Sequence, residues 1–245
     1  MTAARLDYRK PLEIRPIKIS TQYFGRSYAN VLIEMGKTVV LCSVTYQIGV
    51  PKFLKGTQFG WLTAEYSMLP AATHERSQRD HQRSNPNGRS LEIQRLIGRV
   101  LRQSIALEKV PNATLVVDCD VLQADGGTRI AALNGASIAL AIACQKLEKE
   151  KKIEPNAFKS FVGGISCGIV QNEVLLDLSY EEDSNATADG HCILNSLDQI
   201  VEIHAFGEQG AISESQYQQL VHSGMQGAKQ ILEWQQKQIT ALSLS

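Results

Sequence analysis

The order of strand-like and helical segments repeats within this chain, and this repetition restricts the fold more than any other feature. Runs rich in β-branched residues come first and helical patterns follow, and the same order then recurs in the second half. Strands before helices, twice over, predict an α+β protein of two related strand–helix halves, with mixed sheets packed with helices. The predicted strands cover 15–20, 29–34, 38–46, 60–69, 113–122, 161–170, 173–180, 187–194 and 199–206.

Three helices complete this pattern. The first begins near Arg89, and the second runs from Thr128 to about residue 150, with the small residues that suit close packing on a sheet. The last begins near Ser213, whose spacing from Gln216 matches a capping box. No low-complexity linker divides the 245 residues, so we expect a single domain, 1–245, with halves of about 1–152 and 153–245.

Composition narrows the class of protein. The formal net charge is zero, which argues mildly against a dedicated nucleic-acid binder, although charge can still be segregated along the chain. The five cysteines form no C-x-x-C pair and lie mostly in apolar runs, which predicts reduced core thiols rather than a disulfide or zinc framework. The chain has no signal-peptide pattern, and the stretch 131–144 is too short to span a bilayer, so we expect a cytoplasmic protein without membrane association.

The sharpest local signal is the turn from Gln123 to Arg129, between a predicted strand and a predicted helix. Two adjacent glycines, Gly126 and Gly127, let the backbone approach a ligand closely. The helix N-terminus offers free N–H groups that suit an oxyanion, while Thr128 adds a hydroxyl and Arg129 a forked cation. The turn therefore predicts a phosphate site, and the alternative is a plain tight turn with Thr128 as N-cap.

A second glycine–arginine helix start lies at Asn87, Gly88 and Arg89. The helix dipole disfavours a cation in the first turn, so an arginine there is better explained if an anion joins it. The alternative is a solvated surface arginine. Two such helix starts in one chain weigh against that alternative.

Residues 177–189 form an acidic segment. A phosphoryl-transfer site needs carboxylates to hold a divalent cation or to protonate a leaving oxygen. In an extended strand Asp183 and Asp189 would lie about 20 Å apart, too far to share one site, so the chain must turn between them. Ser184 and Asn185 suit such a turn. The alternative is a solvated acidic hairpin.

Together these segments resemble the ribonuclease PH family of phosphate-dependent tRNA 3′-processing exoribonucleases. The similarity runs in order across nearly the whole chain, and motifs of this length are far more specific than one glycine pair. The matching stretches are RPIKI (15–19), GVPKFLKG (49–56), GWLTAEYSMLP (60–70), GRSLEIQRLIGRVLR (88–102), DCDVLQADGGTR (118–129) and DLSYEEDSNATAD (177–189).

The resemblance implies a fold of two related halves, a homohexamer built as a trimer of dimers, a magnesium ion, and inorganic phosphate as co-substrate. Phosphate would attack the last phosphodiester at RNA 3′ ends, those of tRNA precursors in this family, and release a nucleoside diphosphate. The reverse nucleotide addition is expected as well. By the family's motifs, phosphate is bound by Arg89, Gly127, Thr128 and Arg129, and the catalytic, metal-holding acids are Asp183 and Asp189.

A basic stretch, residues 73–102, is a candidate RNA track, because seven arginines there accompany three acids. For the helical arginines the alternative is salt bridging, since Glu92 and Glu108 lie nearby at helical spacings. The track consists of Arg76 and Arg79 from a loop and of Arg95, Arg99 and Arg102 from one helix face.

The chain departs from the family pattern at two places. Ala71 stands where we expect an arginine that contacts RNA, and Gly190 and His191 stand where we expect a hydrophobic residue and an asparagine.

Two other functions stay open. A non-catalytic, RNA-binding subunit of an exosome-like ring would be expected to lack a phosphate or acidic residue, and none is missing. A hydrolytic metal nuclease would be expected to gather more ligands than one acidic pair.

Overall fold

The computed structural model describes residues 5–21, 24–79 and 87–243, which form two sheets with a helix between them. The first sheet has the strand order β1-β2-β3-β5-β4, and its strands pair antiparallel except for β4, which runs parallel to β5. Its strands are β1 (Ile17–Thr21), β2 (Ala29–Met35), β3 (Thr38–Ile48), β4 (Trp61–Met68) and β5 (Ala113–Gln123).

The helices of the first half follow the strands that they cover. A parallel pair needs a long crossover connection, and the α1 helix lies in the one that joins β4 to β5. The α2 helix leaves the end of β5 and contacts strands of both sheets. The helices are α1 (Gly88–Leu101) and α2 (Thr128–Lys149), with the short 3-10 segments η1 (Lys52–Leu54), η3 (Arg102–Ser104) and η4 (Leu107–Lys109).

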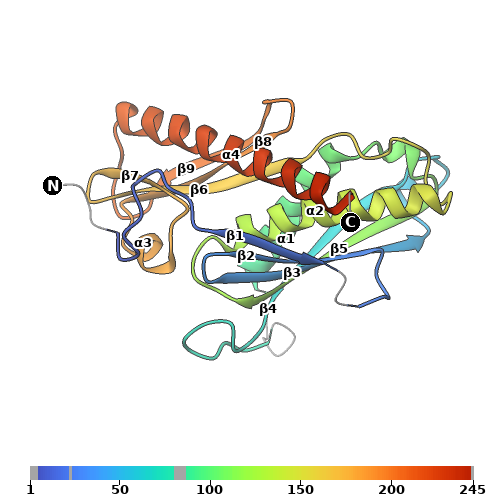
Figure 1. Cartoon of the computed structure of the whole chain (residues 1–245), viewed down its shortest axis with the longest axis horizontal. Coiled ribbons are helices and arrows are strands. Elements are labelled where there is room, and N and C mark those ends of the chain that lie inside the picture. The colour runs from blue at the N-terminus through green and yellow to red at the C-terminus, as the bar shows by residue number, and fades with distance from the viewer. Residues whose placement is uncertain (1–4, 22–23, 80–86, 244–245) are drawn as a thin grey trace.

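The second half is a smaller antiparallel sheet with a long outer helix. Its strand order is β7-β6-β8-β9, and the last helix packs mainly on β6 and β8. Figure 1 shows this helix, in red, along the outer side of the sheet. The elements are β6 (Val162–Val170), β7 (Glu173–Leu176), α3 (Tyr180–Ser184), β8 (Ala188–Asn195), β9 (Ile200–Gly207) and α4 (Glu214–Ser243).

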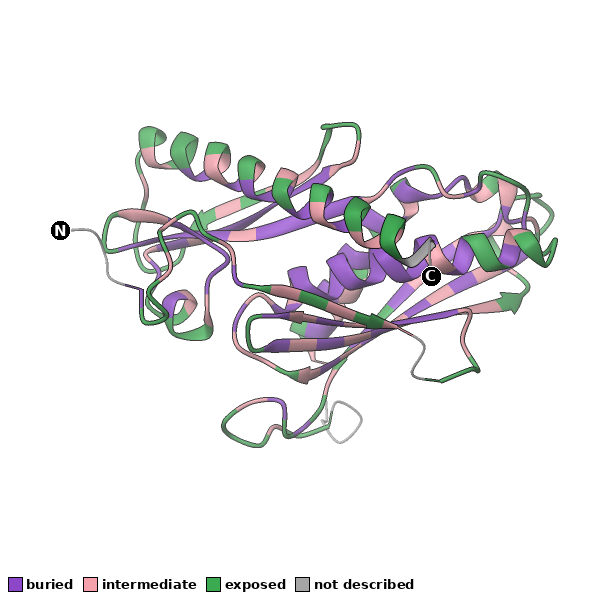
Figure 2. Cartoon of the chain, in the orientation of Figure 1, coloured by how far each residue is buried: buried purple, intermediate pink, exposed green. Residues whose placement is uncertain are grey.

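The α2 helix forms the centre of the core. It is buried on almost every side, which is why its sequence lacks a polar stripe, whereas α4 has an exposed outer face (Figure 2). By length and composition α2 is also the one described helix that would fit a membrane, and its burial between the two sheets accounts for its apolar character. All five cysteines are buried free thiols.

The predicted α+β fold with two related halves is confirmed, with one local error. The strand predicted over 173–180 ends at Leu176, and a one-turn helix, α3, begins at Tyr180. The Ser179 hydroxyl accepts a hydrogen bond from the Glu182 N–H, and the Glu182 carboxylate accepts one from the Ser179 N–H. This capping box stabilises the helix in place of the expected strand end. At the last helix, the capping box predicted between Ser213 and Gln216 is present.

Candidate active site

The Gly-Gly turn at the end of β5 packs against the backbone that leads into α3. Gly126 and Gly127 have φ angles of 73° and 63°, a region that glycine adopts without strain. A Cβ atom at Gly126 would lie 2.5 Å from the Leu178 carbonyl oxygen, so no larger residue fits there. The Thr38 hydroxyl donates to the Gly126 carbonyl and accepts from the Asp125 N–H. The turn of the first half is thus fixed against the acidic segment of the second.

The N-terminus of α2 begins directly at this turn. Gly127 is the N-cap residue and provides no side-chain cap, so the alternative with Thr128 as N-cap is wrong. Thr128 is instead the first helical residue, and its buried hydroxyl accepts a hydrogen bond of 2.9 Å from Tyr66. Uncapped N–H groups at a helix N-terminus suit an anion.

Two arginines lie in the first turns of the two long helices of the first half. Arg89 is exposed at the start of α1, where the Asn87 side chain caps the helix by accepting from the Arg89 N–H. Arg129 follows Thr128 in α2, and its guanidinium donates to the Glu92 carboxylate at 2.6 Å. The expected arginines are therefore both at helix starts, and one of them is already paired with an acid of α1.

Asp183 and Asp189 lie on neighbouring elements of the second half. Asp183 is on α3, and Asp189 is the second residue of β8, where it pairs in register with Gly168 and Phe206. Burial first and the nearby Asp183 carboxylate second raise the pKa of Asp189 to about 6. The turn expected between them is present, because α3 ends at Ser184 before β8 begins.

The charges of both arginines reach this acidic pair. Burial raises the pKa of Asp183, while Arg89 and Arg129 act in the opposite direction and the Glu208 carboxylate adds to the rise. Arg129 also opposes the rise in the pKa of Asp189. The structure therefore brings the residues expected to bind phosphate close to those expected to be catalytic.

The acidic pair fits a hard divalent cation. The Asp189 Oδ1 atom is buried and has no hydrogen-bond partner among the described residues. A buried carboxylate oxygen without a partner is costly unless a cation or a proton joins it. The described residues contain no group of three or more potential metal ligands. Magnesium commonly binds through one or two carboxylates and keeps several waters, so this donor set suits it better than zinc.

The arginines of the candidate RNA track have different environments. Arg76 and Arg79 are exposed on the loop that follows β4, and Arg95 is exposed on α1. Arg99 instead forms an ion pair with Glu202 of β9, so the expected salt bridge exists with a partner far along the chain rather than with Glu92 or Glu108. Arg102 does not extend the track, because its guanidinium stacks 4.5 Å from the Trp61 ring centroid and donates to the Leu62 carbonyl.

The two departures from the family pattern lie near the site. Ala71 is exposed and lines a pocket of about 340 Å³ that also includes Asp125 of the Gly-Gly turn. His191 is buried two residues after Asp189, with its Nε2 atom 3.4 Å from a Glu202 carboxylate oxygen. The pair of His191 with Glu202 therefore supports β8 from β9.

Sequence reasoning missed several residues that build the site. The buried pair of Arg15 and Asp177 lies beneath the Gly-Gly turn, and Tyr66 orients Thr128 from β4. Ser179 and Glu182 matched the capping-box pattern, and this pattern would have predicted α3. No local sequence pattern predicts the contacts of Arg15, because its partners lie more than a hundred residues away along the chain.

Two family models cover most of the chain. The model described as the 3′ exoribonuclease family, domain 1, matches residues 13–145, and the model of domain 2 of that family matches residues 160–227. The chain belongs to the ribonuclease PH family. This membership confirms the resemblance found in the sequence motifs.

Solved structures share the ribonuclease PH fold at low sequence identity. Rice (Oryza sativa) Rrp46 superposes with a TM-score of 0.75 at 20% identity, covering 95% of this chain and 98% of that one. A chain of the Archaeoglobus fulgidus exosome with RNA bound to the active site gives 0.79 at 21% identity, with coverages of 94% and 92%. An archaeal exosome core chain gives 0.74 at 20%, with coverages of 95% and 91%. At this identity the likeness establishes the fold alone.

Proposed function

We propose that this protein is a phosphorolytic 3′-to-5′ exoribonuclease, which shortens RNA from its 3′ end with inorganic phosphate. The observation that carries the proposal is the meeting of Arg89 and Arg129 with Asp183 and Asp189 at one place, on opposite sides of the contact between the two halves. Cations that hold an anion and carboxylates that handle a metal or a proton are the two requirements of phosphoryl transfer.

The residues of the first half would bind and orient phosphate. Arg89, Arg129, the Thr128 hydroxyl and the N–H groups of α2 hold the anion beside the last internucleotide phosphorus. The arginines offset the repulsion between the two phosphates and stabilise the transition state. One phosphate oxygen forms a bond to that phosphorus as the bond to the 3′ oxygen of the penultimate nucleotide breaks, and a nucleoside diphosphate leaves.

The acidic residues of the second half would hold the metal and help to protonate the leaving oxygen. Asp183 and Asp189 are the residues that would hold magnesium, which when bound neutralises charge on the reacting phosphates. The departing 3′ oxygen must gain a proton, and one of the two aspartates relays it from water, because an ionised carboxylate carries no proton of its own. The bond energies on the two sides of the reaction are similar, so the same site would add nucleotides from diphosphates.

The substrate is proposed to be RNA, with tRNA 3′ ends as the physiological target and a homohexamer as the working assembly. Two observations support RNA. One is the exposed set of Arg76, Arg79 and Arg95, and the other is the RNA bound to the archaeal relative. The family resemblance supports the ring and the tRNA.

A second candidate is a non-catalytic RNA-binding subunit of an exosome-like ring. The observation in its favour is that the solved relatives described above are the archaeal exosome chains and Rrp46. Against it stands the complete set of phosphate and acidic residues in this chain.

One assay separates these functions. Purified protein is incubated with 3′-extended tRNA and magnesium, with and without phosphate, and the released nucleotides are identified. We expect nucleoside diphosphates that appear only with phosphate. Monophosphates without phosphate would indicate a hydrolytic nuclease, and RNA binding without any release would indicate the non-catalytic subunit.

The Arg129→Ala variant links this activity to the site. The lost charge-assisted contact is worth roughly 1.5–3 kcal/mol, hence at least about tenfold in rate at low phosphate, with RNA affinity little changed. Arg26→Ala, at an exposed position outside the site, is the matched control. Wild-type phosphorolysis by the Arg129→Ala enzyme would remove Arg129 from the phosphate site.

A further inference from the structure

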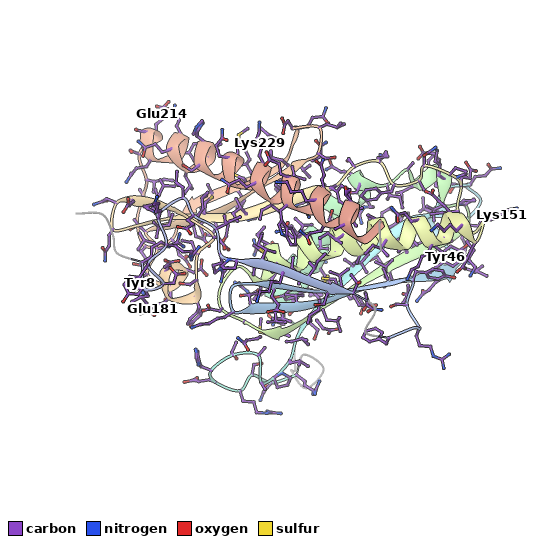
Figure 3. The ribbon with its side chains drawn as sticks, in the orientation of Figure 1. Tyr8, Tyr46, Lys151, Glu181, Glu214 and Lys229 are labelled. Carbon is purple, nitrogen blue, oxygen red and sulfur yellow. The ribbon has the colours of Figure 1, made fainter. Side chains whose placement is uncertain are left out.

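Three ion-paired residues beneath the site come from the N-terminal segment that precedes β1, and the first is Arg5. Its side chain is fully buried, and its Nε and Nη2 atoms donate hydrogen bonds to the two Glu182 carboxylate oxygens, at 2.7 and 2.8 Å. Nη2 also donates to the carbonyls of Leu176 and Asp177, at 3.0 and 3.1 Å. Glu182 directly precedes Asp183 and caps α3, so Arg5 fixes the one-turn helix that carries a proposed catalytic acid. Figure 3 shows Tyr8 of this segment and Glu181 of α3 at the same end of the molecule.

Arg15 joins the two halves beneath the Gly-Gly turn. Its Nε and Nη2 atoms donate to the two Asp177 carboxylate oxygens, at 2.9 and 2.7 Å, and its Nη1 atom donates to the Asp125 carbonyl at 2.6 Å. A Cβ atom at Gly127 would lie 3.2 Å from Nη2. One planar guanidinium therefore holds the proposed phosphate turn and the start of the acidic segment at a fixed separation.

Arg9 completes the set with weaker contacts. It lies 3.7 Å from both the Asp177 and Glu182 carboxylates and donates to the Asp177 carbonyl. Burial of charged pairs contributes little net stability compared with apolar packing of the same volume. Their geometric specificity is the property that apolar side chains would not provide, because a bidentate fork fixes distance and orientation together.

We propose that Arg5 and Arg15 are positioning residues, which align the acidic pair of the second half with the phosphate turn of the first. The inference rests on the proposed function for the identity of the two sites. The contacts also give the two arginines different effects. Of the two sites, Arg5 touches only the acidic side, and its Nη1 atom donates to carbonyls of the N-terminal segment itself (Lys10, Pro11 and Glu13). Arg15 touches both the acidic side and the turn.

The experiment compares Arg5→Lys and Arg15→Lys with the exposed control Arg26→Lys. Lysine keeps the charge but loses the fork. Two readouts are taken on the full-length protein. The first is kcat together with the KM for RNA and for phosphate, and the second is amide hydrogen exchange of the segments 125–129 and 178–184 without substrate.

We expect kcat to fall at least about tenfold in both variants, the range typical when a supporting contact behind a metal or catalytic group is lost. In Arg5→Lys both KM values stay within about twofold, and exchange rises only in 178–184, because the turn is untouched. In Arg15→Lys the phosphate KM also rises, and exchange increases in both segments. A loss of thermal stability alone would not lower kcat in both variants while raising the phosphate KM in only one of them.

The inference is overturned if folded Arg15→Lys keeps wild-type kcat, or if exchange is unchanged in both segments. If that variant does not fold, Arg15→Gln combined with Asp177→Asn replaces it, because this neutral pair leaves no buried charge unpaired, and the same two readouts decide. If the wild-type protein shows no phosphorolysis, the proposed function fails and the exchange pattern alone decides the positioning role.

Discussion

The Arg129 guanidinium lies 2.6 Å from the Glu92 carboxylate, so an ion pair joins the first turn of α2 to α1 at the proposed phosphate site. Phosphate must either displace this carboxylate or share the arginine with it. Both partners are partly exposed, and such a pair is worth at most about 1 kcal/mol. The ion pair therefore weakens phosphate binding without preventing it.

Glu92→Gln should strengthen phosphate binding. Removing the negative charge frees Arg129 and reduces repulsion of the anion, so we expect the KM for phosphate to fall by up to about fivefold. The RNA KM should stay the same. Steady-state kinetics at varied phosphate measure this, with Glu108→Gln as the control. An unchanged or higher phosphate KM in Glu92→Gln would show that phosphate does not use Arg129.

Asp189→Asn should abolish turnover and stabilise the metal-free fold. Asp189 has a pKa of about 6 in the folded protein, above the 3.8 of an unperturbed aspartate, so the folded state binds this proton more tightly than the unfolded state. Its contribution to stability therefore falls as pH rises from about 4 to about 6 and stays lost above. At pH 7.5 the asparagine variant should gain about 1–2 kcal/mol, less than the full shift because solvent screens a partly exposed group.

Urea unfolding in the presence of a chelator measures this gain. Asp198→Asn, at an exposed turn position, is the control and should change little. The gain for Asp189→Asn should shrink as pH falls and vanish well below the unfolded pKa of 3.8, where the wild-type carboxyl is protonated in both states. A destabilised variant at pH 7.5 would contradict the account, since it would mean that the ionised carboxylate has a stabilising partner.

Magnesium affinity should depend on pH in the same range. The cation binds the ionised carboxylate, so protons compete with it below the Asp189 pKa of about 6. We expect the dissociation constant for magnesium to rise by up to about tenfold per pH unit below 6 and to be nearly flat above 7. Calorimetric titration between pH 5 and pH 8 would show this. A constant affinity over that range would place the metal elsewhere.

Arg76 and Arg79 should contribute to RNA binding through phosphate contacts. Neutralising both removes two charges, which should raise the RNA KM and flatten the slope of log affinity against log salt by about 1.4 for single-stranded RNA. Phosphate affinity should be preserved, because neither residue is among the site's arginines. The control exchanges Arg26 and Lys52, two other exposed cations, for alanine. If the slope of log affinity against log salt is the same in wild type and in the Arg76/Arg79 variant, these arginines do not form an RNA track.

Local patterns predicted most of the elements and marked the residues of the candidate site. The Gly-Gly turn, the two glycine–arginine helix starts and the acidic pair are each encoded within a few neighbouring residues, and the structure brings them close together. The strand predicted through residue 180 failed, because the capping box at Ser179 and Glu182 starts a helix directly after the apolar run that forms β7.

No local sequence pattern predicted the ion pairs between residues that lie far apart along the chain. Arg99 pairs with Glu202, and Arg15 pairs with Asp177, across separations that no helical or strand periodicity encodes. Arg102 resembled a third member of an exposed helix face, but α1 ends at Leu101 and the side chain stacks on Trp61. Tertiary contacts therefore decide which arginines stay free for a ligand.

The most direct test of the proposed chemistry follows the phosphorus atom of inorganic phosphate. Protein, magnesium, ³²P-labelled phosphate and an unlabelled oligoribonucleotide are incubated, and the nucleotides released are separated. The account predicts that the label appears in the β-phosphate of a nucleoside diphosphate, and that Asp189→Asn yields none. Unlabelled nucleoside monophosphates would contradict it, because they would show that water, not phosphate, attacks the RNA.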